Sequence, residues 1–173
     1  MRQCNIITTC MVVATISSIS FAETLLVPGD YGSIQSAIDI AVEGDVVQVD
    51  AGIYYETIDF LGKAITVIST DGDPSGTTID GGVSEGSVVS FITGETGASV
   101  LEGFTIRNGS AVDGGGVYIR GDADAVSGSP TIRNCVISGN SASRFGAGIY
   151  LESGRLSLED VAVIGNASVK TGA

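Results

Sequence analysis

The sequence predicts an all-β fold, a parallel β-helix (solenoid) built from a repeated unit. Three segments can be laid over one another, namely Gly103-Phe104-Thr105-Ile106, Asn134-Cys135-Val136-Ile137 and Asp160-Val161-Ala162-Val163. Their starts are 31 and 26 residues apart, within the range of periods that indicates a solenoid. Apolar residues alternate within each segment, as expected for a strand that shows one face to a core.

A second shared phrase follows two of these segments and supplies a glycine-rich turn. Gly116-Val117-Tyr118-Ile119 and Gly148-Ile149-Tyr150-Leu151 are each preceded two residues earlier by another glycine. Asn-Gly or Gly-Asn pairs also recur at equivalent positions, where a corner needs residues that tolerate positive φ. The predicted repeat residues are Phe104, Ile106, Cys135, Ile137, Val161 and Val163 in the strands, and Gly116 and Gly148 at the turn.

The amino end carries the pattern of a secretory signal peptide. Arg2 precedes an apolar run from Ile6 to Ile19, and small residues stand at positions −3 and −1 before Glu23. Residues 1–22 are therefore predicted to be a cleaved signal peptide, and residues 23–173 a single β-helix domain. A transmembrane anchor is the alternative, but the run contains several Thr and Ser and is shorter than the roughly 20 residues that span a bilayer.

A capping region is predicted over residues 24–45, before coils over residues 46–173. Residues 25–27 are expected to form a short strand, and Ile34, Ala37, Ile38 and Ala41 follow at the spacing of an amphipathic helix. Ser33 is the predicted N-cap of this helix and Gly44 its stop. We expect the helix to cover the open end of the core, where strand edges would otherwise be exposed. Early strands are predicted at 46–49, 64–68 and 88–92.

Composition agrees with this fold and limits the chemistry. The chain has 25 glycines and 43% apolar residues, but neither histidine nor tryptophan. The absence of histidine excludes serine–histidine nucleophile activation and histidine metal sites. Cleavage after residue 22 would remove Cys4 and Cys10, so Cys135 is predicted to be a small buried hydrophobe without a disulfide partner.

The charge distribution excludes nucleic acid as a partner. The net charge is −12, and residues 23–100 contain 13 acids against the single base Lys63. Such a surface repels phosphate backbones. Arg107 aligns with Ser138, whereas Arg133 aligns with Glu102 and Glu159. The arginines therefore do not form one ladder and are expected to be scattered and solvated.

Three amino-terminal stretches carry a resemblance to a known family. Residues 30–38 read Asp-Tyr-Gly-Ser-Ile-Gln-Ser-Ala-Ile, residues 43–49 read Glu-Gly-Asp-Val-Val-Gln-Val, and residues 52–56 read Gly-Ile-Tyr-Tyr-Glu. Together they resemble the opening of secreted pectin-lyase-fold proteins, among them pectin methylesterases. The later Gly-Gly-x-Tyr coils resemble right-handed β-helix repeat proteins. The resemblance implies a right-handed parallel β-helix and a secreted or cell-surface location.

The esterase chemistry that the resemblance implies uses two aspartates, an arginine and oxyanion-polarising glutamines. The chain departs from that pattern, because Gln35 and Gln48 are its only glutamines after residue 22 and both lie in or near the capping region. No glutamine on a later coil can then stabilise an oxyanion. Gly52, Tyr54 and Glu56 are therefore expected to be structural residues of the first corner.

Lyase chemistry on this fold would need a base and, usually, calcium beside the substrate carboxylate. Two Asp-x-Asp pairs in loops are the calcium candidates, and no other cofactor is predicted. Neither pair continues with the residues of a dedicated calcium loop, so loop solubility is the favoured interpretation. Hydrolysis by two facing carboxylates stays open. The calcium candidates are Asp71, Asp73, Asp122 and Asp124.

The repeat register also predicts how the chain ends. Gly172-Ala173 aligns with Gly146-Ala147, so a Gly-aliphatic-Tyr sequence would come next. We therefore expect a chain truncated at its carboxyl end, with any catalytic coils lying beyond Ala173.

The predicted function is a secreted β-helix scaffold, a non-catalytic carbohydrate-binding or cell-surface adhesion module that lacks a complete catalytic set. The alternative is an amino-terminal fragment of a polysaccharide lyase or pectinesterase-like enzyme acting on acidic polysaccharides. A third reading is a purely structural surface repeat. The expected partner is a polysaccharide or cell-surface glycan, with no nucleic acid and no membrane span in the mature chain.

Overall fold

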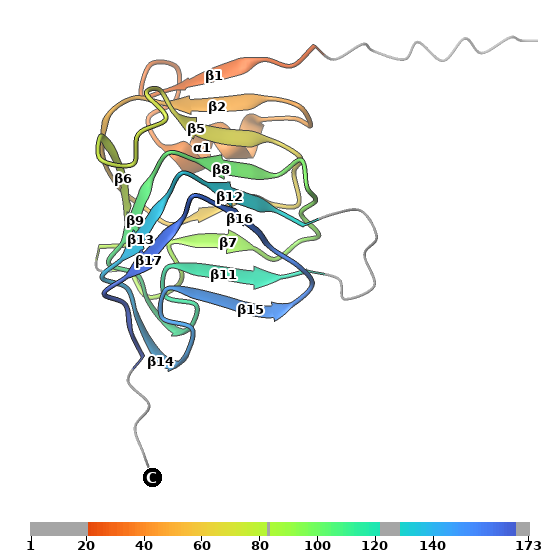
Figure 1. Ribbon diagram of the computed structural model, residues 1–173. Helices are drawn as coiled ribbons and strands as arrows, with labels where there is room; N and C mark the ends of the chain where they lie inside the picture. Colours follow the sequence, from red (N-terminus) through yellow and green to blue (C-terminus); the bar gives the residue numbers. More distant parts are fainter. Residues whose placement is uncertain (1–20, 83, 122–128, 169–173) are drawn as a thin grey trace, which may run out of the picture.

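In the part of the chain that the structure describes, the fold is all-β, with parallel strands and one short helix (Figure 1). A computed structural model describes residues 21–82, 84–121 and 129–168. Most of the predicted signal peptide, Asp122, Asp124 and the carboxyl-terminal Gly172-Ala173 lie outside these residues. Within them, no helix is long and apolar enough to cross a bilayer.

The strands form four sheets, which we name A to D. In sheet order, sheet A contains β1 (Thr24–Val27), β2 (Val46–Val49), β5 (Thr66–Ser69), β8 (Val100–Glu102), β12 (Thr131–Arg133) and β16 (Ser157–Glu159). Sheet B contains β3 (Gly52–Tyr55), β6 (Thr77–Asp80), β9 (Thr105–Arg107), β13 (Val136–Ser138) and β17 (Ala162–Ile164). Sheet C contains β4 (Ile58–Asp59), β7 (Val89–Phe91), β11 (Val117–Arg120) and β15 (Ile149–Ser153). Sheet D contains β10 (Ser110–Asp113), β14 (Ser141–Phe145) and β18 (Ala167–Ser168).

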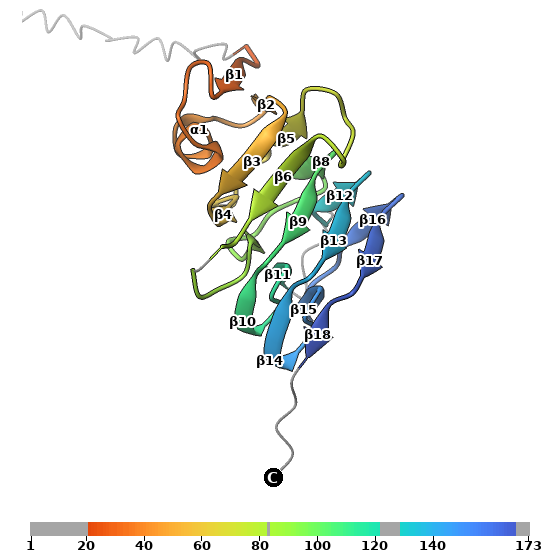
Figure 2. The same ribbon diagram turned by 90° about the vertical axis from the view of Figure 1, so that its left-hand side faces the viewer.

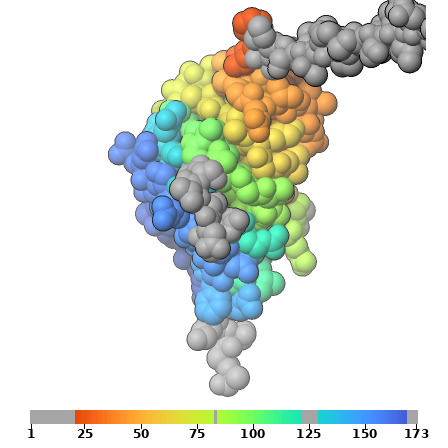
Figure 3. Space-filling view, turned by 90° about the vertical axis from the view of Figure 1, so that its right-hand side faces the viewer, coloured from red at the N-terminus to blue at the C-terminus, as the bar shows by residue number. Residues whose placement is uncertain are grey.

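The chain visits the sheets in a fixed order. It passes from sheet A to B to C and back to A, and the later passages include sheet D between B and C. We call one such passage a coil. Figure 2 shows the strands of sheet B side by side in chain order, and Figure 3 shows the same progression on the surface, from orange to blue. Parallel pairing between successive coils is compatible with a β-helix solenoid.

The strand registers confirm the repeat alignment. Ile106 pairs with Ile137, which pairs with Val163, and Val117 pairs with Ile149. Phe104, Ile106, Cys135 and Ile137 are buried, as predicted for inward-facing residues. The turn residues Gly116 and Gly148 are buried too.

The third unit of the repeat departs from the predicted burial. Val161 is half-buried and packs against the core, as predicted for an inward-facing residue. Val163 pairs with the buried Ile137 but is 46% exposed. The physical reason is that β17 is the last strand of sheet B, and no described strand stacks beyond it.

One corner of the repeat is held by stacked asparagines. Asn108, Gly139 and Gly165 adopt positive φ at equivalent positions, with values of 59°, 66° and 63°. Asn140 and Asn166 follow the two glycines. The Asn140 carboxamide oxygen accepts from the backbone N–H of the residue after Asn108 at 2.9 Å, and that of Asn166 accepts from the Asn140 N–H at 3.0 Å. Each asparagine thus satisfies a corner amide of the preceding coil.

The predicted helix is present as α1 (Ile34–Ile40), with Ser33 as its N-cap. Its buried face, Ile34, Ala37 and Ile38, belongs to the main core, and the helix packs against β1, β2 and β4. The predicted stop at Gly44 is wrong, because the helix ends at Ile40 and the buried Ala41 is its C-cap. The Asp45 carboxylate accepts from the backbone N–H of Val42 at 2.8 Å and holds the chain in a non-helical path before Gly44 is reached.

Candidate functional site

The Gly-x-Tyr-x-Glu residues have structural contacts, as predicted. The two carboxylate oxygens of Glu56 accept from the backbone N–H groups of Ile34 and Gln35, both at 2.9 Å. A carboxylate at a helix N-terminus satisfies amides that lack an intrahelical partner and favours the helix dipole. The Tyr54 hydroxyl donates to the backbone carbonyl of Asp50 at 2.9 Å. These residues anchor α1 and the first corner.

The described calcium candidates do not assemble a metal site. The Asp73 carboxylate accepts from the backbone N–H of Ser75 at 2.8 Å, and this bond holds the pKa of Asp73 below its usual range. Asp71 is exposed. Among the described residues no group of three or more His, Cys, Asp or Glu side chains could hold a metal ion. The pair Asp122 and Asp124 lies outside those residues.

Cys135 lies in the core as a small apolar side chain. It is 1% exposed, and burial raises the pKa of its thiol to about 11. The thiol is therefore protonated at neutral pH, and because the thiolate is the reactive form, Cys135 does not supply a nucleophile.

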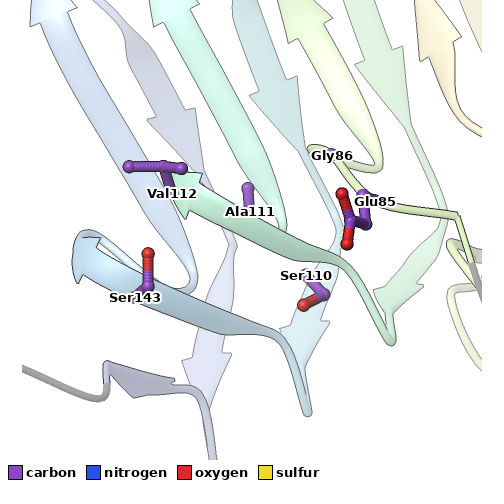
Figure 4. Close-up of a pocket in the computed structure, with 6 residues that line it drawn as sticks. All are labelled: Glu85, Gly86, Ser110, Ala111, Val112 and Ser143. Carbon is purple, nitrogen blue, oxygen red and sulfur yellow. The ribbon is translucent and has the colours of Figure 1, made fainter.

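Two hollows lie at β10. The larger, of about 440 Å³, is lined by Glu85, Gly86, Ser110, Ala111, Val112 and Ser143 (Figure 4). The smaller, of about 280 Å³, is lined by Gly86, Ser87, Ala111, Val112, Asp113 and Tyr118. The two hollows share Gly86, Ala111 and Val112, so they adjoin. We call the combined feature the β10 groove, lined by the residues of both hollows.

The local backbone explains how the β10 groove forms. Gly86 and Ser110 exchange backbone hydrogen bonds of 2.7 and 3.2 Å, which fix the segment before β7 against the start of β10. Figure 4 shows Glu85 beside Ser110 at this contact, with Val112 and Ser143 farther along the two neighbouring strands. Val112 is 60% exposed. The groove therefore combines hydroxyl groups, two carboxylates and an exposed apolar side chain.

Three aromatic rings adjoin the β10 groove. The ring centroids of Tyr118 and Tyr150 are 5.8 Å apart with planes at 14°, and those of Tyr150 and Phe145 are 6.2 Å apart at 16°. These distances fall within the range of offset stacking, in which each ring covers only part of its neighbour. Tyr118 also lines the smaller hollow. We call Tyr118, Tyr150 and Phe145 the aromatic stack.

Charged groups surround the aromatic stack. The Arg144 Nε lies 3.0 and 3.1 Å from the two carboxylate oxygens of Asp113, and its guanidinium carbon lies 5.5 Å from the Phe145 ring centroid. The Tyr118 hydroxyl donates to the Glu152 carboxylate. The hydrogen bond from Arg144 lowers the pKa of Asp113, and the hydrogen bond to Glu152 raises the pKa of Tyr118. Asp113 is therefore a poor proton donor, and Tyr118 a poor proton acceptor, at neutral pH.

The arginines form no single ladder, as predicted, but three of them pair with acids on the neighbouring coil. Arg107 lies 2.9 Å from Asp80 and Arg133 lies 2.7 Å from Glu102. Arg144 forms the third pair, with Asp113. The side chains of these three arginines are 39–59% exposed, so they are solvated as predicted, and the coil stacking in addition brings an acid of the previous coil beside each one.

The comparisons with known proteins identify no family for this chain. No protein-family profile matches the chain, and no curated protein matches it significantly. The resemblance to pectin-lyase-fold proteins therefore stays a prediction. What the geometry offers is an open groove with aromatic, hydroxyl and ionised groups side by side.

The aromatic stack was not predicted from the sequence, although the repeat already placed two of its three residues at equivalent positions. Tyr118 and Tyr150 occupy the same place in the Gly-x-Tyr phrase, between inward-facing aliphatic residues, so period-two alternation places both rings on the outer face. Phe145 belongs to another strand and another sheet, and only the folded corner brings it to Tyr150.

Proposed function

We propose that this chain is a secreted or cell-surface scaffold of the right-handed parallel β-helix type, with α1 capping its amino end and a non-catalytic glycan-binding surface on its outside. The surface is the aromatic stack together with the β10 groove. The observation that carries the proposal is the continuity of the two, since Tyr118 belongs to both.

The physical basis is the two-sided chemistry of a sugar ring. Its C–H groups form apolar faces that pack on aromatic rings, and its hydroxyl groups need donors and acceptors around their rim. The aromatic stack supplies the first, with Phe145 48% exposed. Ser110 and Glu85 in the groove supply the second. Exposed apolar patches rimmed by polar groups mark interaction sites on soluble proteins.

The coil stacking supports a ligand that extends over two neighbouring coils. Tyr118 and Tyr150 lie on neighbouring coils at paired positions. The groove likewise combines Ser110 of β10 with Ser143 of β14, the next strand of sheet D. A polymer lying across the strands contacts equivalent positions in succession, so its contacts add up along its length.

Affinity electrophoresis of the whole chain in gels that contain soluble polysaccharides tests the proposal. We expect retardation by at least one polymer, and a loss of affinity of about tenfold in Tyr118→Ala, which corresponds to about 1.4 kcal/mol of aromatic contact. Tyr55→Ala is the matched control, because Tyr55 is 74% exposed on sheet B and belongs to neither feature. Equal losses in both variants would contradict the assignment of the surface.

Two outcomes would replace the proposal with another function. Release of unsaturated sugars or methanol from uronate polymers in the presence of calcium would favour the enzyme alternative. Retardation by no polymer at all would favour a purely structural surface repeat.

A further inference from the structure

Resting on the proposed glycan-binding function, we infer that the ligand is an uncharged polysaccharide and that uronate polymers are disfavoured at this surface. The inference concerns the charges that a bound sugar would meet in the β10 groove and along the aromatic stack. A scaffold that holds acidic polymers would instead need a surface with an excess of positive charge.

Carboxylates dominate the surface. Glu85 lines the larger hollow, Asp113 lines the smaller one, and Glu152 bonds the hydroxyl of Tyr118. A uronate residue in the larger hollow would bring a further negative charge beside Glu85. Like charges placed together oppose binding and select against the wrong partner.

The nearby cations do not reverse this balance. Arg144 is engaged by both oxygens of Asp113 and lies over the Phe145 ring, so its guanidinium is already committed. Arg120 is exposed at the end of β11, and its positive charge acts to lower the pKa of Tyr118. The Arg144–Asp113 pair is neutral as a whole. Arg120 therefore stands against two carboxylates, those of Glu85 and Glu152.

The polar groups suit hydroxyl-bearing sugars instead. Carboxylates and serine hydroxyls accept hydrogen bonds from sugar hydroxyl groups, and an ionised acceptor makes the stronger bond. Glu85 and Ser110, side by side in the larger hollow, present such acceptors (Figure 4). Val112 and the aromatic rings then contact the apolar faces of the same sugars.

The test compares polymers that differ only in charge. Affinity electrophoresis uses uronans such as polygalacturonan and alginate, each beside its own carboxyl-reduced, neutral form. At low salt, we expect the carboxyl-reduced polymer to bind at least about fivefold more tightly than the uronan from which it was made. The ratio of the two affinities should fall towards one at about 0.5 M salt, because salt screens the charges.

Two charge variants locate the effect. Glu85→Gln should weaken the repulsion of uronans and so bring the ratio of neutral-polymer to uronan affinity closer to one. Glu43→Gln removes the same charge from an exposed turn near α1 and should leave this affinity ratio unchanged. Tighter binding of a uronan than of its neutral form would overturn the inference while leaving the glycan-binding proposal intact. Equal effects of the two variants would also overturn it. Binding of no polymer of either kind would overturn the proposed function, and this inference with it.

Discussion

The Asn140 side chain is the clearest place to perturb the stacking of the coils. It is 1% exposed, and its oxygen accepts from the backbone N–H of Gly109 at 2.9 Å. Its amide nitrogen donates to the Ile106 carbonyl at 3.1 Å and to the Asn166 side-chain oxygen at 2.9 Å. Asn140→Ala removes all three hydrogen bonds and leaves the Gly109 N–H and the Ile106 carbonyl of the preceding coil without this partner.

The expected loss follows from those two backbone groups. Each buried group that loses its partner costs about 1–3 kcal/mol, so we expect Asn140→Ala to lower the free energy of unfolding by about 2–6 kcal/mol. With an m-value near 2 kcal/mol/M in urea, the unfolding midpoint falls by about 1–3 M.

Urea unfolding followed by far-UV circular dichroism measures this midpoint directly. Ser138→Ala is the control, because Ser138 is half-buried on the outer face of β13, and we expect it to stay within about 0.5 kcal/mol of the parent. A loss below about 1 kcal/mol in Asn140→Ala, or a loss equal to that of the control, would refute the reasoning that this corner amide couples the coils.

The remaining predictions concern the turn, an ion pair and the thiol. Gly116→Ala places a Cβ 2.5 Å from the Gly148 carbonyl oxygen and should destabilise the fold by about 1–3 kcal/mol in the same assay. Gly32→Ala, where a Cβ meets nothing within 4 Å, should not destabilise it by steric overlap. Burial acts to raise the pKa of Asp80, but hydrogen bonds from Asn108, the Gly82 N–H and Arg107 outweigh it and hold the pKa below its usual value. The resulting stability is present above the unfolded-state pKa near 4 and is lost as the pH falls through the lower folded-state value, so acid titration of unfolding should show a shallower slope in Asp80→Asn. Cys135 should resist alkylation at pH 8 in the folded chain and react once urea unfolds it, as read by mass spectrometry of its peptide; rapid labelling of the native chain would contradict its burial.

The repeat could be predicted because its signals are local. Apolar residues alternate within each strand and glycine or asparagine marks each corner, so aligning the sequence with itself was enough to place Ile106 beside Ile137 and Val117 beside Ile149. Helix α1 was predicted for the same reason, from its apolar spacing and its Ser33 cap.

Contacts between coils could not be predicted, because they depend on how the corners fold. The Arg144–Asp113 pair requires β14 to lie beside β10 with a register shift at that point. The aromatic stack requires Phe145, before the turn, to approach Tyr150, after it. The β10 groove arises where Gly86 meets Ser110, two residues with no shared pattern. The end of α1 was misplaced because the bond from Val42 to Asp45 has no periodic signal.

The claim that the aromatic stack holds a glycan is tested most directly by aromatic-ring NMR. An oligosaccharide of the polymer that retards the chain is titrated into the protein while the ring resonances of tyrosine and phenylalanine are followed. We predict that the resonances of Tyr118, Tyr150 and Phe145 shift together and saturate with one affinity, while those of Tyr54 and Tyr55 on β3 stay in place. Saturable shifts at Tyr54 and Tyr55, with the aromatic stack unchanged, would contradict the account.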